Sequence, residues 1–160
     1  MNKLLLVLLL PFCAQSQHEF KTLDSRIVWQ HTFTDTVQPL QLFDVLKLRP
    51  AYIDCNYDQN IIFGHSDFID LIKDNSRLAI YARYDVRYSY SIDFKEDKYR
   101  VTLTNLFFDP LDARRSLTLD DLLLKSKDGS LRSAKIHQRF YERLHEALIK
   151  EFTYTAPEKW

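Results

Sequence analysis

The strict alternation of apolar and polar side chains in RYDVRYSYSIDFKEDKYRVTLTN, positions 83–105, constrains the fold of this chain more than any other feature. Successive side chains of a β-strand point to opposite faces of a sheet, so alternation is typical of strands that bury one face. The apolar side of the first half comprises Tyr84, Val86, Tyr88, Tyr90, Ile92 and Phe94. The side expected to return against it, after a turn at Glu96 and Asp97, comprises Tyr99, Val101, Leu103, Asn105 and Phe107. The segment is therefore predicted to be a long hairpin, and its register is fixed because a one-residue slip would expose the apolar face.

The segments before this hairpin predict a strand, a helix and another hairpin. Positions 26–33 alternate like a first strand, whereas positions 18–25 are polar and are expected to be loose. Positions 39–49 place apolar residues at helical spacing, and Pro50 ends that helix. Positions 51–65 contain two β-rich pieces around the turn-forming letters DQN, which predicts a hairpin.

The remaining segments supply helices. A short one is expected within positions 66–76, and another begins at Ser116 or Thr118. The strongest helix signal covers positions 131–152, where apolar residues recur every four positions. They are Ile136, Phe140, Leu144, Leu148 and Phe152. We therefore predict one α+β domain over residues 26–155, a single antiparallel sheet with helices on one face in the order β-α-β-β-β-β-α.

Residues 1–16, MNKLLLVLLLPFCAQS, are typical of an export signal. Lys3 precedes a seven-letter apolar run, which is shorter than the roughly 20 residues that span a bilayer. Ala14 and Ser16 are small residues at the positions that a signal peptidase recognises, so cleavage is predicted before Gln17. The alternatives are an uncleaved anchor and lipidation of Cys13, although a bulky residue precedes that cysteine.

The expected location is therefore the periplasm or the exterior of the cell, with membrane attachment only if Cys13 is lipidated. Without the leader, Cys55 is the one cysteine left, so no internal disulfide is expected. Cys55 has the same strand parity as Ile53 and Tyr57, and we expect it to be a small buried hydrophobe on a strand.

The element order and two stretches, YIDCNYDQNIIFGH and DFKEDKYRVTLTN, resemble an exported bacterial family of unknown function with a TATA-binding-protein-like (TBP-like) fold. The second stretch fits a D-x-K-(D/E)-x-(K/R)-Y-R-x-T-x-T-N pattern, of which KYRVTLTN is the most specific part. The similarity spans positions 26–109 and is looser in the C-terminal helix, while positions 66–80 diverge. The resemblance implies export and a TBP-like fold, and it brings no catalytic or binding residues.

Motifs for chemistry are missing from the sequence. Two glycines in the whole chain exclude a glycine-rich phosphate loop, and neither GxSxG nor HExxH occurs. His137 and His145 are expected to be solvated or packed helix residues, and His31 a satisfied core histidine. We therefore predict no catalytic residue, no metal ligand and no cofactor, and hence a protein that is not an enzyme.

The polar side of the hairpin is the candidate interaction face. It is formed by Arg87, Ser89, Lys95, Arg100, Thr102 and Thr104. Either it is simply a solvated sheet face, or it binds an envelope protein, a peptide or a glycan. Nucleic acid is not expected, because the formal net charge is zero and the chain is expected to be exported.

The predicted function is a non-enzymatic binding or scaffold module of the envelope or periplasm. The alternative is a small hydrolase of envelope polymers, built on carboxylates that the fold brings together.

Overall fold

The alternating segment folds as the predicted hairpin and forms the centre of the sheet. Strands β5 (Asp85–Lys95) and β6 (Lys98–Asp109) pair antiparallel, with Ile92 opposite Val101 and Tyr90 opposite Leu103. All four of these side chains are at least 97% buried. The register is therefore the one that the apolar pattern requires.

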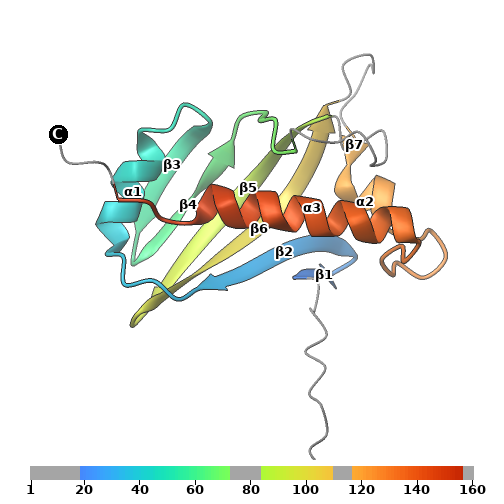
Figure 1. The fold of residues 1–160 in the computed structure, drawn as a ribbon, viewed down its shortest axis with the longest axis horizontal. Helices are drawn as coiled ribbons and strands as arrows, with labels where there is room; N and C mark the ends of the chain where they lie inside the picture. The colour runs from blue at the N-terminus through green and yellow to red at the C-terminus, as the bar shows by residue number, and fades with distance from the viewer. Residues whose placement is uncertain (1–18, 73–83, 110–116, 157–160) are drawn as a thin grey trace, which may run out of the picture.

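The structure is a computed structural model that describes residues 19–72, 84–109 and 117–156. Figure 1 shows the remaining elements around the central hairpin. The other strands are β1 (Phe20–Leu23), β2 (Arg26–Phe33), β3 (Tyr52–Asp58), β4 (Ile61–Ser66) and β7 (Leu117–Thr118). The helices are α1 (Pro39–Lys47), α2 (Leu119–Leu123) and α3 (Lys135–Phe152). None of these helices is both long enough and apolar enough to cross a membrane.

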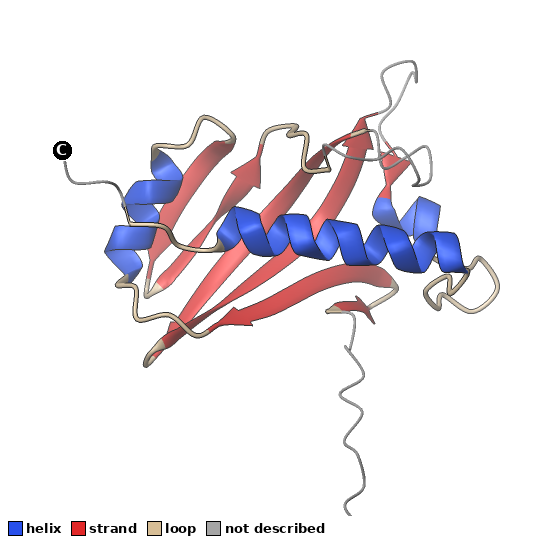
Figure 2. Cartoon of the chain, viewed as in Figure 1, coloured by secondary structure: helices blue, strands red, loops and turns tan. Residues whose placement is uncertain are grey.

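The strands form one antiparallel sheet in the order β1-β2-β6-β5-β4-β3, and β7 adds to β6. Figure 2 shows helix α3 lying across one face of this sheet. The predicted fold class and the order β-α-β-β-β-β-α are confirmed, by β2, α1, β3, β4, β5, β6 and α3. The structure adds β1 and β7, and α2 is the short helix that was expected to begin at Ser116 or Thr118, with Thr118 as its N-cap.

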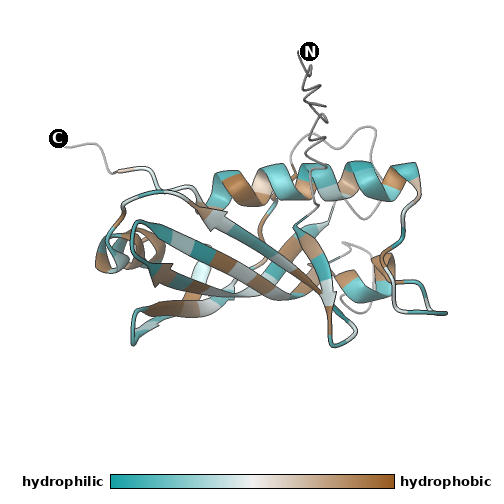
Figure 3. Ribbon diagram, turned by 90° about the horizontal axis from the view of Figure 1, so that it is seen from below, coloured by the Kyte–Doolittle hydropathy of each residue, from teal (hydrophilic) through white to brown (hydrophobic). Residues whose placement is uncertain are grey.

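Helix α3 crosses one face of the sheet, with α1 near its C-terminal end and α2 near its N-terminal end (Figures 1 and 3). Its buried residues are Phe140, Tyr141, Leu144, Leu148 and Phe152. Phe152 packs against rings from three strands, including Tyr52, Tyr88 and Trp29, at centroid distances of 6.0 to 6.4 Å. Ile136 is 47% exposed, so the apolar stripe begins one turn later than its four-residue spacing suggests. Covering the sheet removes its aromatic face from water, which is the main stabilising term of the fold.

Two segments differ from the sequence-based expectation. Residues 18–25 were expected to be loose, but Phe20–Leu23 form β1, which pairs with β2 through a turn at Asp24 and Ser25. Both turn residues have positive φ (48° and 62°), as a two-residue hairpin turn requires. The helix expected within 66–76 is absent over the described positions 67–72, where Ile69 instead bridges to Val86. Positions 73–76 lie outside the described residues.

Two β-bulges reverse the face assignment at the ends of strands. Asn105 has a φ of 51°, and the register between β5 and β6 shifts beside it. As a result Leu106 and Phe108 are buried, and Phe107 joins the face opposite α3, whereas alternation had placed Asn105 and Phe107 on the covered face. Asp54, with a φ of 52°, makes the matching bulge in β3. An inserted residue shifts the parity of everything beyond it, which strict alternation cannot predict.

Candidate functional site: the open sheet face and a histidine–glutamate cluster

The six residues of the predicted interaction face all lie on the side of the hairpin opposite α3. Cross-strand pairing brings Ser89 beside Thr104, and it places Thr102 and Arg100 opposite Ser91 and Asp93. Arg87 lies farther along β5, and Lys95 lies at the turn. No described helix covers this face of β4, β5 and β6 (Figure 3), so we call it the open face.

The polar side chains of the open face are tied to their neighbours. Arg100 pairs with Asp93 at 3.3 Å, and the Arg87 guanidinium lies 4.8 Å from the Phe68 ring and 5.4 Å from the Phe107 ring. Hydrogen bonds run from Asn105 Nδ2 to Ser89 Oγ at 3.2 Å and from Gln30 Nε2 to Thr102 Oγ1 at 2.9 Å. Both arginines are therefore already engaged. Arg100 is in an exposed ion pair, and Arg87 makes cation–π contacts.

The open face also carries an apolar row that sequence reasoning missed. Ile53, Ile61 and Phe63 are 45%, 37% and 43% exposed. Ile61 and Phe63 stand opposite the polar residues Asp93 and Ser91 of β5. Ile53 and Cys55 are two positions apart and would share a face in a regular strand. The bulge at Asp54 reverses this parity, so Ile53 lies on the open face beside Ile61 and Phe63. The alternation of β4 could have revealed the other two, since Ile61 and Phe63 share the parity of His65.

A hollow of about 550 Å³ opens at the end of this face. Its lining includes Asp54, His65, Arg87, Ser89 and Phe107. His65 and Ser89 are direct cross-strand partners, so the fold gathers the residue types of a serine–histidine–aspartate arrangement. Among the described residues, however, no hydrogen bond joins His65 to either Ser89 or Asp54, and Ser89 Oγ accepts from Asn105 instead.

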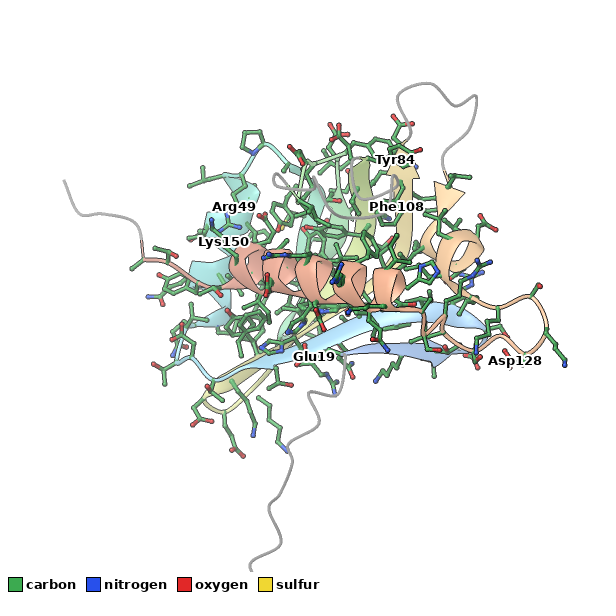
Figure 4. All side chains as sticks on the ribbon, turned by 45° about the vertical axis from the view of Figure 1, so that its right-hand side comes forward. Glu19, Arg49, Tyr84, Phe108, Asp128 and Lys150 are labelled. Atoms are coloured by element: carbon green, nitrogen blue, oxygen red, sulfur yellow. The ribbon has the colours of Figure 1, made fainter. Side chains whose placement is uncertain are left out.

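A second group of polar residues lies at the opposite face, where α3 meets β1 and β2. Glu19 Oε1 contacts His31 Nδ1, and Glu19 Oε2 lies 3.5 Å from His145 Nδ1. Trp29 Nε1 donates a hydrogen bond to that same His145 nitrogen at 3.1 Å. Figure 4 places Glu19 beneath α3 and beside β2. The side chains of Glu19, His31 and His145 are 25 to 32% exposed, so His31, expected to be a satisfied core histidine, is satisfied by Glu19 but is only partly buried.

A third group ties the end of α3 to the sheet. Glu151 accepts hydrogen bonds from Tyr52 Oη at 2.8 Å and Arg49 at 3.3 Å, and Tyr52 Oη lies 3.5 Å from Tyr88 Oη. Burial raises the pKa of the Tyr52 and Tyr88 hydroxyls well above their usual range. A hollow of about 490 Å³ beside this group holds two acids, Asp70 and Glu151, together with Arg49 and Lys150. Because Glu151 is bound to its two donors, we interpret this group as a structural link.

Cys55 lies on β3, half-buried against the core, as expected of a small hydrophobe. Burial raises the pKa of its thiol, which opposes formation of the reactive thiolate.

Comparison with known proteins identifies relatives by fold and not by sequence. No family model matches the sequence, and no curated protein is similar to it. The crystal structure of a DUF4468 family protein from Bacteroides ovatus is similar, with a TM-score of 0.50 and 14% identity over 88% of this chain and 94% of that chain. A TBP-like protein from Parabacteroides distasonis gives a TM-score of 0.46 and 11% identity over 82% of this chain and 93% of that one. The first of these structures confirms the expected resemblance to a family of unknown function, and at 14% identity the likeness concerns the fold alone.

Proposed function

We propose that this protein is an exported, non-enzymatic binding module that holds a protein partner on its open face. One observation carries the proposal, the exposed row of Ile53, Ile61 and Phe63 on an uncovered sheet face. A group of large, exposed apolar side chains that is bordered by polar residues is typical of an interaction site.

The composition of the open face favours a protein over other ligands. Its apolar row is flanked by the hydroxyls of Ser89, Thr102 and Thr104, which matches the apolar core and polar rim of a protein interface. Two of the three apolar residues are isoleucines, which offer no flat ring for stacking against sugars or bases. The formal net charge is zero and Arg100 is already paired with Asp93, so a phosphate backbone finds little free positive charge.

Export is part of the proposal and rests on the leader pattern in residues 1–16. Intact-mass measurement of the protein recovered from its own host tests it. We expect a chain that begins at Gln17. A mass that retains Met1 contradicts cleavage, and a mass with acyl chains on Cys13 places the protein on a membrane.

Photocrosslinking tests the binding surface directly. A photoreactive phenylalanine derivative replaces Phe63 on the open face or, as a matched control, Ile136, which is 47% exposed on α3. We expect a discrete adduct with one host protein from position 63 and none from position 136. The double variant Arg87→Glu with Arg100→Glu should remove that adduct while the protein stays folded, because it reverses charge beside the row.

Two outcomes would overturn this proposal. Equal labelling from positions 63 and 136 would mean that the open face is ordinary solvated surface. An adduct consisting of two copies of this chain would make the face a self-association surface instead.

A serine hydrolase, a different chemistry from the carboxylate hydrolase considered from the sequence, has one observation in its favour, the placement of His65 opposite Ser89 in the hollow that Asp54 also lines. A fluorophosphonate probe reacts with activated serines and distinguishes the two functions. We expect no modification of Ser89, because no hydrogen bond links it to His65 among the described residues. Stoichiometric modification that is lost in His65→Gln would establish the hydrolase.

A further inference from the structure

The cluster of Glu19, His31 and His145 joins three elements that are far apart in the sequence. Glu19 precedes β1, His31 lies on β2 and His145 lies on α3. One potential ligand atom from each residue falls within 4.8 Å of the others. Ligands of a tetrahedral zinc ion are roughly 3.3 Å apart, so closing the widest pair takes about 1.5 Å, which side-chain torsions can supply.

The hydrogen-bond pattern leaves one oxygen of Glu19 without a donor among the described residues. An indole N–H can only donate, so the bond from Trp29 Nε1 means that His145 Nδ1 presents a lone pair and not a proton. Glu19 Oε2 is buried, accepts no hydrogen bond among the described residues, and lies 3.5 Å from that nitrogen. A buried carboxylate oxygen without a donor is destabilising, because it has lost its hydrogen bonds to water. A cation that replaces the Trp29 N–H at His145 Nδ1 would also pair with Glu19 Oε2.

We propose that Glu19, His31 and His145 bind a divalent cation of the zinc class. Two imidazoles and one carboxylate suit Zn²⁺, Ni²⁺ or Cu²⁺, whereas Mg²⁺ and Ca²⁺ prefer oxygen ligands alone. The three side chains are 25 to 32% exposed, so a fourth coordination position is open to water. The cation competes with the Trp29 N–H for His145 Nδ1, and binding it would tie Glu19 to α3.

This site is separate from the open face. The open face is opposite α3, whereas the cluster lies where α3 meets the sheet (Figures 3 and 4). Its test therefore succeeds or fails independently of the proposed partner-binding function.

Calorimetric titration with Zn²⁺ of the protein without a histidine tag tests the site. We expect one bound ion per chain. Glu19→Gln and His145→Gln should each weaken binding at least about 10-fold, because each removes a ligand. His137→Gln is the matched control, since His137 lies on the same helix but outside the cluster, and it should leave the affinity unchanged.

Trp29 provides a second readout. The chain has two tryptophans, so Trp160→Phe leaves Trp29 as the single indole. Its ring lies 6.0 Å from the His31 ring and 6.1 Å from the His145 ring, and Ni²⁺ bound between them should quench its fluorescence. The quenching should saturate with the same stoichiometry as Zn²⁺ binding and disappear in Glu19→Gln.

Thermal melting separates loss of the site from loss of the fold. Zn²⁺ should raise the melting temperature of the wild type and of His137→Gln, but not of Glu19→Gln. If Glu19→Gln does not fold without metal, His31→Gln takes its place. Zn²⁺ binding of equal affinity in the wild type and in the cluster variants would overturn the proposal, as would no binding by the wild type at micromolar Zn²⁺.

Discussion

At the scale of single residues, Gly64 shows how one position without a side chain sets the packing of its surroundings. It lies on β4 opposite Tyr90 of β5, on the covered face. A Cβ atom placed there would come within 2.7 Å of the Asp54 backbone oxygen and 2.8 Å of the Tyr90 hydroxyl oxygen. The glycine therefore lets the tyrosine ring and the bulge of β3 approach the strand backbone.

We expect Gly64→Ala to lower the free energy of unfolding by about 1–3 kcal/mol, the usual effect of overpacking. Tyr90→Phe removes one of the two close oxygens, so the double variant should lose less than the sum of the two single variants. Urea melts of the four proteins measure this coupling. Gly129→Ala is the matched control, because its Cβ meets nothing within 4 Å and only its φ of 64° opposes the change. Additive effects of Gly64→Ala and Tyr90→Phe would contradict the contact.

At the scale of elements, the β5–β6 hairpin has one face buried beneath α3 and one face exposed to solvent. Tyr88 is 1% exposed beneath α3, while its neighbour Ser89 faces outward and accepts a hydrogen bond from Asn105. Adjacent positions of one strand thus have opposite environments, as the alternation predicted.

Tyr88→Asp should prevent folding, because it buries an unpaired carboxylate and removes a core ring. Ser89→Asp should change the free energy of unfolding by no more than about 0.5 kcal/mol, since the new carboxylate meets water and can still accept from Asn105. Circular dichroism and urea melts of the two variants provide the measurement. Equal damage from both would show that the two faces are assigned wrongly.

At the scale of the whole molecule, the core contains several buried tyrosines, and the hydroxyls of Tyr52 and Tyr99 donate hydrogen bonds to residues of α3. Tyr99 donates to the Phe152 carbonyl oxygen at 2.8 Å, and burial is the main cause that raises its pKa to about 12. Burial also raises the pKa of Tyr52, Tyr88 and Tyr90. These groups are neutral in the folded protein at pH values where the unfolded chain has begun to ionise.

The sign of the pH dependence follows from these shifts. A tyrosine whose pKa is raised in the folded state contributes its full stabilisation at pH values below the pKa of an unfolded tyrosine, about 10. This contribution is lost as the pH rises toward the pKa of the folded state. We expect the free energy of unfolding to fall above pH 10, by up to about 1.4 kcal/mol per pH unit for each tyrosine. The free energy of unfolding of Tyr99→Phe should fall less steeply with pH than that of the wild type. Urea melts from pH 9 to 12 test this, and a slope that is the same in Tyr99→Phe would contradict it.

The sequence by itself determined the elements with strong local patterns, which are β2, α1, β3, β4, β5, β6, α2 and α3. Alternation set the register of β5 and β6, and apolar spacing placed α3. Element order and apolar faces together predicted the α+β sheet with one covered face, since the apolar face of the sheet and the apolar stripe of the helix bury each other. The polar residues of the open face were predictable for the same reason.

Only the tertiary structure decided which residues outside these patterns meet. The bulges at Asp54 and Asn105 moved Ile53 and Phe107 to the open face, because an inserted residue reverses parity without changing composition. Trp29 and His145 are 116 positions apart in the sequence, and Glu19 belongs to a segment that had no strand signal. Their cluster exists because α3 packs across the edge where β1 pairs with β2. Such a contact depends on how elements pack against each other, and no local pattern encodes it.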